Sequence, residues 1–406
     1  MSPIQDVPIP PDLSRRYGRT HDGRAWLASL PGLIDQCLDQ WELVPDLEPG
    51  ALPWNGHGGV VLPVRRRDGD GSPGDGDGNA AVLKVAFPHE EATREHHALA
   101  LWGGHGAVRL LAANAGSCAL LLERLDACRS LLDVPLETAV TVWGGLVRQL
   151  SVVPDDRPEW QEMDHVAAKA EQWSDDLPAT WEQLGRPFPR WLLEAALEVC
   201  QTRGAVGRRS GKDVLVHADL HYLNVLARPG VPETGNGQPA PAGLASYAAI
   251  DPQPLIGEAE FAVAPLLWNR VRELPQRDPG RALLARCADF SAAAGLDAET
   301  ARQWSLAREV ENALSYASLR HHEGDLARSL WVASTLAGRT LPGLPAPQEL
   351  PAPGEAPRRP SMERGRRLAP YGRQRVADGV DGDSDVGVVR APVAHRYPQD
   401  VALLPA

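Results

Sequence analysis

The sequence predicts an α+β protein with two lobes. Short strand-like segments are concentrated in the first third of the chain, up to about Asp126, whereas helical patterns dominate from there to Ala337. The chain has 406 residues, which is enough for about two domains of ordinary size. We therefore expect a strand-rich first lobe at 1–126 and a helical second lobe at 127–341.

The first lobe is expected to begin with an amphipathic helix, because apolar residues recur at helical spacing over 26–41. Strands are predicted at 59–64, 80–86, 108–112 and 119–123, with a helix at 88–102 that begins at a proline and ends at two glycines. The acidic, glycine-rich segment 68–78 is expected to form a long, mobile hairpin turn, since no bidentate Glu completes a calcium loop.

The second lobe shows two clear apolar helix faces, one around Trp143 and one around Trp191. Strands are predicted at 214–216 and 246–250, joined by a Gly/Pro-rich stretch, 228–245, that should extend into solvent, and helices continue to Ala337. Residues 342–406 are rich in Pro, Gly and Arg and are expected to be a disordered tail. We interpret the acidic run at 381–385 within it as solvated charge.

Composition restricts the class of function. The net charge of −12 argues against a nucleic-acid-binding surface and is compatible with a cationic small-molecule substrate. No stretch approaches the length of an apolar membrane helix, and the first residues do not resemble a signal peptide. The five cysteines are scattered, so we expect buried free thiols and a cytoplasmic protein.

The most informative motif is the octapeptide 217–224, which follows the apolar run 214–216. Asp219 and Asn224 have the spacing of a phosphotransferase catalytic loop, in which the Asp orients or deprotonates a hydroxyl group and the Asn oxygen binds Mg²⁺. An ordinary polar loop after a buried strand is the alternative. We expect His217 to hold this loop by hydrogen bonds rather than to act as a base, and His221 to border the site.

Phosphoryl transfer also needs a second metal ligand and a cation for the nucleotide phosphates. Asp251 ends the apolar run 246–250 and is predicted to be the metal ligand, although a plain Asp-Pro turn is possible. Lys84, one of three lysines in the chain, lies within a predicted strand and is the candidate cation. Glu95 on the next helix is our first choice for its anionic partner and Glu91 our second, while a solvated helix face is the alternative for Glu95.

The remaining nucleotide contacts are predicted from weaker signals. Gly58 and Gly59 precede a strand and would let backbone N–H groups approach phosphates, but a simple turn explains them equally well. Adenine would be read by the backbone of the linker between the lobes, which includes Glu123 and Leu125. His321 and His322 are adjacent, so their side chains diverge on a helix and a surface helix end is favoured over a metal site.

Taken together, these motifs resemble the aminoglycoside phosphotransferase family, and within it the branch of streptomycin 6-phosphotransferase and hydroxyurea phosphotransferase. The likeness covers 25–337 and is carried by these segments: 25–31 (AWLASLP), 82–85 (VLKV), 106–111 (GAVRLL), 121–125 (LLERL), the octapeptide, 249–252 (AIDP) and 261–267 (FAVAPLL). It implies a protein-kinase-like fold, ATP and Mg²⁺ as cofactors, and transfer of a phosphoryl group to a hydroxyl of a cationic aminoglycoside such as streptomycin.

The resemblance also implies roles for individual residues: Asp219 as the catalytic residue, Asn224 and Asp251 as Mg²⁺ ligands, and Lys84 with Glu95 at the ATP phosphates. Two positions depart from the branch, because Ala262 and Glu258 each replace an Asp. Carboxylates of the second lobe would bind the acceptor, with Asp155, Asp156, Glu159, Asp164, Glu258 and Glu260 as candidates. Another acceptor, such as hydroxyurea or a metabolite, an inactive kinase-like protein, and a tail that binds a partner remain as alternatives.

Overall fold

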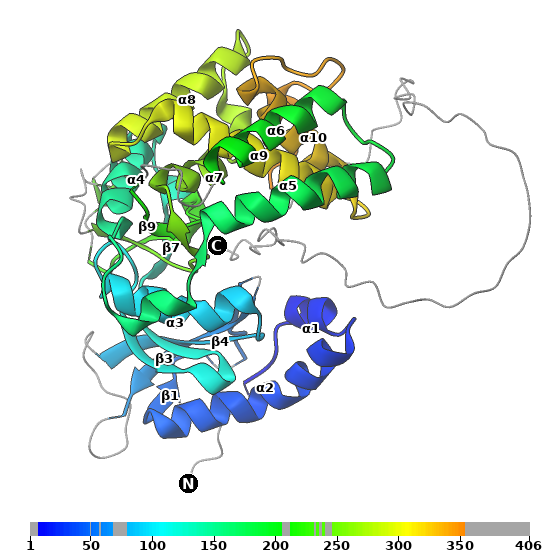
Figure 1. Ribbon diagram of the computed structural model, residues 1–406. Coiled ribbons are helices and arrows are strands. Elements are labelled where there is room, and N and C mark those ends of the chain that lie inside the picture. Colours follow the sequence, from blue (N-terminus) through cyan, green and yellow to red (C-terminus); the bar gives the residue numbers. More distant parts are fainter. Residues whose placement is uncertain are drawn as a thin grey trace, which may run out of the picture.

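The structure, a computed structural model, describes residues 7–353 except 49, 57, 68–78, 205–211, 231–232, 235–237 and 240–245. These residues form two lobes, a small one built on a sheet and a larger one built on helices (Figure 1). The predicted α+β, protein-kinase-like architecture is confirmed. The expected turn at 68–78 and the acidic run at 381–385 lie outside the described residues, as does most of the connection 228–245.

An antiparallel six-stranded sheet forms the small lobe, in the order β1-β3-β4-β6-β5, with β2 paired to β3. The strands are β1 Leu43–Pro45, β2 Trp54–Asn55, β3 Gly59–Arg66, β4 Ala80–Ala86, β5 Leu110–Asn114 and β6 Ala119–Glu123. Strands β3 to β6 were expected, whereas β1 and β2 are too short to show a period. The central position of β4 places Lys84 in the middle of the sheet.

Three helices accompany this sheet: α1 Pro11–Tyr17, α2 His21–Gln40 and α3 Glu90–Trp102. Helix α2 begins five residues earlier than predicted, because the Thr20 side chain accepts a hydrogen bond from the Gly23 N–H and caps it. Its buried residues Leu30 and Ile34 belong to the same core cluster as the sheet. Helix α3 ends at Gly103 in the left-handed conformation, as the paired glycines predicted.

The large lobe is mostly helical. In the part that the structure describes, its helices are α4 Leu136–Leu150, α5 Val166–Gln183, α6 Arg190–Arg203, α7 Ala264–Trp268, α8 Pro279–Ala294, α9 Ala298–Ala317 and α10 Glu323–Leu336. Helix α9 lies at the centre and packs against α5, α6, α7, α8 and α10, and it carries buried polar residues as well as apolar ones (Figure 1). Among these, Glu309 accepts a hydrogen bond from Asn312 at 3.0 Å.

Two small three-stranded sheets contain the strands on either side of the octapeptide 217–224. One joins β7 Asp126–Ser130, β10 Val225–Ala227 and β13 Tyr247–Ala249, and the other joins β8 Asp164–His165, β9 Val214–His217 and β14 Pro254–Gly257. The octapeptide therefore leaves one sheet at β9 and enters the other at β10. Because both ends are paired in a sheet, the loop between them is anchored on two sides.

The chain remains ordered beyond the predicted start of the tail. Residues 342–353 pack on the large lobe: Leu350 is buried, its carbonyl accepts from Arg272, and the Pro351 carbonyl accepts from Arg328. The boundary at 341 was thus placed too early, and residues from 354 onward lie outside the described residues. Four cysteines are buried free thiols as expected, but Cys128 is exposed. None of the described helices is long and apolar enough to cross a membrane.

Candidate active site

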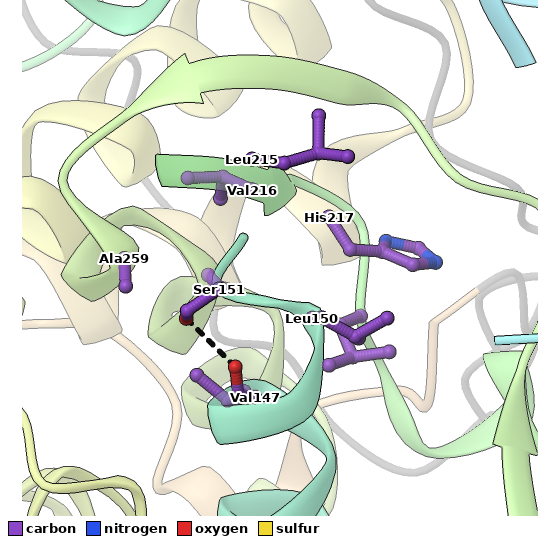
Figure 2. A pocket seen from close by; sticks show the side chains of 9 residues that line it. Val147, Leu150, Ser151, Leu215, Val216, His217 and Ala259 are labelled. Carbon is purple, nitrogen blue, oxygen red and sulfur yellow. Dashed lines mark hydrogen bonds between the residues drawn. The ribbon is translucent and has the colours of Figure 1, made fainter. Parts of the chain in front are cut away.

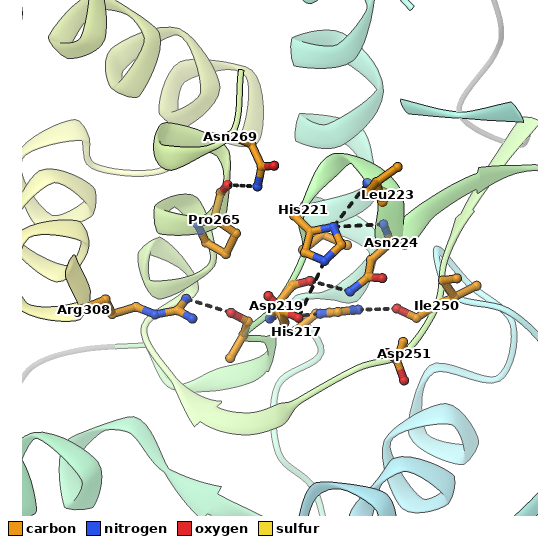
Figure 3. A network of polar contacts seen from close by, with 12 residues as sticks. His217, Asp219, His221, Leu223, Asn224, Ile250, Asp251, Pro265, Asn269 and Arg308 are labelled. Carbon is orange, nitrogen blue, oxygen red and sulfur yellow. Dashed lines mark hydrogen bonds and ion pairs between the residues drawn. The ribbon is translucent and has the colours of Figure 1, made fainter. Parts of the chain in front are cut away.

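The catalytic-loop candidate is held through its backbone (Figure 3). Three successive carbonyl groups each accept a hydrogen bond from a side chain: Ala218 from Arg308 at 2.7 Å, Asp219 from Asn224 at 2.9 Å, and Leu220 from the Trp143 indole at 3.0 Å. These donors come from α9, from the loop itself and from α4. The loop conformation is therefore fixed by side chains of two helices and by the loop's own Asn224.

His217 has the structural role that the sequence predicted. Its ring is buried, with Nε2 3.0 Å from the Ile250 carbonyl oxygen and Nδ1 accepting from the Asp219 N–H at 3.3 Å. Burial lowers the pKa of His217 to about 4, so the ring is neutral at physiological pH. A neutral ring that donates to one side and accepts from the other links the loop to the strand before Asp251.

Asp219 is almost completely buried, with 1% of its surface exposed. Its Oδ1 atom has no hydrogen-bond partner, and its Oδ2 atom lies 3.8 Å from His221 Nε2. Burial raises the pKa of Asp219 to about 8, while the nearby guanidinium of Arg308 opposes that rise. A buried carboxylate oxygen without a partner is costly, and such groups concentrate where a ligand or a reacting proton completes the hydrogen bonding.

Lys84 makes the predicted ion pair and a second one that was not predicted. Its Nζ atom lies 2.7 Å from both carboxylate oxygens of Glu95 and 2.5 Å from Oδ1 of Asp251. Glu91, the second choice, lies elsewhere, on a cavity wall. Burial would lower the pKa of Lys84, but Asp251 and Glu95 outweigh it and raise this pKa overall. The ammonium group is therefore charged and fixed between the lobes.

Asn224 and Asp251 could together hold a divalent cation. The Ile250 N–H donates to the Asn224 carbonyl at 2.9 Å, so the two residues lie on adjacent backbone segments. The Asn224 amide nitrogen is engaged by the loop, which leaves its side-chain oxygen as the free acceptor. The side chain of Asp251 is 43% exposed, and its backbone is left-handed, with φ of 54°. An amide oxygen and a carboxylate are the donors that Mg²⁺ prefers, so this pair fits that ion.

A cavity of about 1010 Å³ opens beside the catalytic loop, lined by residues of α3, α5, β14 and α9 and by Ala218. Five carboxylates line it, together with three cationic side chains: Glu90, Glu91, Asp164, Asp176 and Glu311, with Arg94, Lys169 and Arg308. Arg94 on α3 reaches Asp164 of the large lobe at 2.6 Å and so joins the two lobes at this cavity.

Of the six carboxylates expected to bind an acceptor, Asp164 alone lines this cavity. Glu258 is buried elsewhere and accepts hydrogen bonds from the Trp304 indole and from Arg203. Asp155 accepts from Arg157 and the Trp160 indole within its own turn. Both carboxylates are therefore occupied by partners within the protein.

The profile of the family described as aminoglycoside/hydroxyurea antibiotic resistance kinase matches residues 40–319. Streptomycin 6-kinase from Streptomyces glaucescens is 36% identical over 77% of this chain and 92% of that protein. The chain belongs to this kinase family. Streptomycin 6-kinase from Streptomyces griseus is 33% identical over 77% of this chain and 92% of its own, and hydroxyurea phosphotransferase from Kitasatospora aureofaciens is 33% identical over 82% and 87%.

Membership confirms the predicted class of enzyme for this kinase, a phosphotransferase that acts on a hydroxyl group, and the predicted branch. Among solved structures, choline kinase LicA from Streptococcus pneumoniae aligns with a TM-score of 0.47 and 11% identity, covering 76% of this chain and 99% of that one. A likeness of that degree says nothing about the substrate.

The kinase departs from the branch at Ala262, which borders a cavity of about 10 Å³ that His217 and Ser151 also line (Figure 2). A larger side chain at position 262 would enter this space, which is no bigger than one water molecule. With no carboxylate at this position, Arg308, Asn224 and the Trp143 indole hold the loop carbonyls. Sequence reasoning missed Arg308 and Trp143, and no local pattern distinguishes them from other helix residues.

The residues predicted from weaker signals to contact the nucleotide lie at the start of β3 and at the end of β6. Gly59 is required by packing, because a Cβ atom there would lie 2.3 Å from the Val85 carbonyl oxygen. Gly58 lies in the turn between β2 and β3, and its carbonyl accepts from Phe87. Glu123 ends β6 and accepts from the Arg109 N–H, and Leu125 is buried between the lobes. His322 precedes α10 at a helix end, as expected.

Proposed function

We propose that this kinase transfers a phosphoryl group from ATP, with Mg²⁺, to a hydroxyl group of streptomycin or a closely related cationic aminoglycoside. The observation that carries the proposal is the 1010 Å³ cavity with five carboxylates, whose wall includes Ala218, the residue next to Asp219. Guanidinium and ammonium groups pair with carboxylates, so such a cavity selects a polycation and brings it to the loop. The two streptomycin 6-kinases among the relatives support the same acceptor.

In this proposal each residue of the site has one role. Asp219, in its ionised form, orients the acceptor hydroxyl and takes its proton, because its Oδ1 atom has no other partner and can accept a hydrogen bond from that hydroxyl. Lys84, aimed by Glu95, binds the nucleotide phosphates. Gly58, Gly59 and the backbone at Glu123 and Leu125 complete the nucleotide site.

Asn224 and Asp251 would hold the metal ion, which when bound neutralises charge on the transferred phosphoryl group. The chain's own contribution is to present both side chains from adjacent backbone segments and to keep Lys84 beside them. His217 holds the loop against the segment that carries Ile250 and Asp251.

The size of the cavity favours an aminoglycoside over hydroxyurea. Pockets of roughly 300–1,000 Å³ enclose drug-sized ligands, and a molecule as small as hydroxyurea would contact one wall at a time. It also carries no charge to pair with the carboxylates. The site gives no support to an inactive kinase-like protein, because the residues proposed as catalytic carboxylate, metal ligands and phosphate-binding cation are all present.

The test is an ATP-consumption assay of the purified full chain with streptomycin, other aminoglycosides and hydroxyurea as acceptors. We expect turnover with streptomycin, its loss in Asp219→Asn, and its retention in Asp175→Asn, which removes an exposed carboxylate of α5 that does not line the cavity. Mass and NMR analysis of the product identify the modified hydroxyl. Binding of ATP without turnover on any acceptor would contradict the proposal, and turnover with hydroxyurea alone would replace the acceptor.

A further inference from the structure

Lys169 is a cation placed inside a cavity that is otherwise rich in carboxylates. It lies in the first turn of α5, is half-buried and lines the 1010 Å³ cavity. It is also one of three lysines in a chain that uses arginine almost everywhere else. The first turn of a helix is an unfavourable place for a positive charge, because the helix dipole is positive there. A specific interaction must therefore hold it.

The first such interaction is with an aromatic wall. The Lys169 ammonium lies 5.7 Å from the centroid of the Trp173 ring, one turn further along α5. Trp173 stacks on Phe261 at 6.2 Å, and the guanidinium of Arg308 lies 4.6 Å from the centroid of the Phe261 ring. The wall is thus made of two rings and two cations in contact, and all four residues line the cavity.

The second interaction is with carboxylates from three other elements. Glu311 of α9, Glu91 of α3 and Asp164 of β8 all act on Lys169 electrostatically and raise its pKa, while burial and Arg308 lower it more. Two of the three belong to the large lobe and Glu91 belongs to the small lobe. Lys169 therefore serves as a counter-ion for carboxylates that face the cavity from both lobes.

The other two cations of the cavity have fixed tasks. Arg94 is paired with Asp164 at 2.6 Å, and Arg308 donates to the carbonyl groups of Ala218 and Phe261. Neither can be removed without loosening the contact between the lobes or the catalytic loop. Lys169 differs from both, because it contacts the Trp173 ring and acts on carboxylates of the cavity wall.

We propose that Lys169 is a specificity-determining residue of the acceptor cavity. Its ammonium group occupies the position beside the carboxylates and the Trp173 ring that a positive charge of the acceptor would otherwise take. This inference rests on the proposed function, because it concerns how many cationic groups of the acceptor the same cavity can bind. Neutralising Lys169 leaves one more negative charge to be balanced by the acceptor. The variant is then expected to bind polycations more tightly than the wild-type enzyme.

The test compares Lys169→Met with the wild-type enzyme in steady-state assays with streptomycin. We expect the KM for streptomycin to fall about ten-fold, as one unscreened charge several ångströms away predicts, with kcat and the KM for ATP unchanged. The streptomycin KM of the variant should also rise more steeply with salt, because one more ion pair is screened. Lys169→Arg keeps the charge and should resemble wild type. Lys212→Met removes an exposed lysine outside the cavity and should change nothing.

Two kinetic results would overturn the inference. A higher streptomycin KM in Lys169→Met would mean that the ammonium itself contacts the acceptor, and an unchanged KM would mean that its charge is not felt in the cavity. If the wild-type enzyme fails to phosphorylate streptomycin, the proposed function fails, and the inference is then decided by calorimetric measurement of streptomycin binding. Tighter binding by Lys169→Met than by Lys212→Met supports it; equal binding, or none by either, overturns it.

Discussion

Replacing Lys84 by Met removes the cation shared by two carboxylates of unequal burial. Glu95 is 4% exposed in its side chain, whereas the side chain of Asp251 is 43% exposed and can be solvated in the variant. The penalty therefore comes from Glu95, left as a buried charge without a partner, and such losses are about 3–5 kcal/mol. We expect Lys84→Met to lower the free energy of unfolding by about that amount.

The second variant isolates this cause. Glu95→Gln alone should cost about 1–2 kcal/mol, because Lys84 keeps its contact with Asp251 at 2.5 Å. In the double variant Lys84→Met/Glu95→Gln no charge is left buried, so most of the stability should return. Turnover should stay lost in both variants that lack Lys84, because neither restores the cation that we propose for the ATP phosphates.

The assay is urea unfolding of all three variants, followed by circular dichroism, with ATP turnover measured on the same preparations. The control pair is Arg190 and Glu194, which lie 2.8 Å apart on α6 with side chains 76% and 56% exposed. Arg190→Met should cost well under about 1 kcal/mol. A double variant no more stable than Lys84→Met, or a Glu95→Gln variant less stable than Lys84→Met, would refute the reasoning.

Three further predictions concern the large lobe. Burial raises the pKa of Glu309 to about 7, so its contribution to stability is present below pH 4.5 and lost as the pH rises to about 7. In urea unfolding, the free energy of unfolding of Glu309→Gln should equal that of the wild type near pH 4.5 and exceed it by about 3 kcal/mol above pH 7. Trp143→Phe removes the indole donor to the catalytic loop and should lower kcat. Trp181→Phe removes an equally buried indole hydrogen bond away from the loop and should cost about the same stability, roughly 2 kcal/mol, without lowering kcat. Equal kcat values in the two variants would contradict this. A chain that ends at Leu341 should be less stable than one that ends at Pro353 by about 2 kcal/mol or more, because it lacks the buried Leu350 and its hydrogen bond. Equal melting temperatures of the two chains in thermal unfolding would exclude that packing.

Local features of the site were predictable from the sequence. Asp219 and Asn224 lie within one loop, and Lys84 lies on a strand with Glu95 on the helix that follows. Such short-range patterns depend on elements whose geometry is fixed by φ, ψ and periodicity. For the same reason four of the six strands of the small lobe were found before the structure was known.

Contacts between distant elements were not predictable. Lys84 and Asp251 are 167 residues apart and meet because the two lobes close on each other. The sequence does not single out the cavity carboxylate Glu311, because its place on the cavity wall depends on how α9 packs against its neighbours. Leu350 stands alone among prolines, so its segment shows no apolar period although the side chain is fully buried.

The bond between Lys84 and Asp251 has a consequence for the order in which ligands enter. The opposite charges of Lys84 and Asp251 neutralise each other. An anion that binds alone must therefore break this ion pair to reach Lys84, and a cation that binds alone must break it to reach Asp251. A ligand that carries both signs satisfies both side chains in a single event. We therefore expect the proposed nucleotide site to bind a preassembled metal–nucleotide pair more readily than free nucleotide or free metal ion.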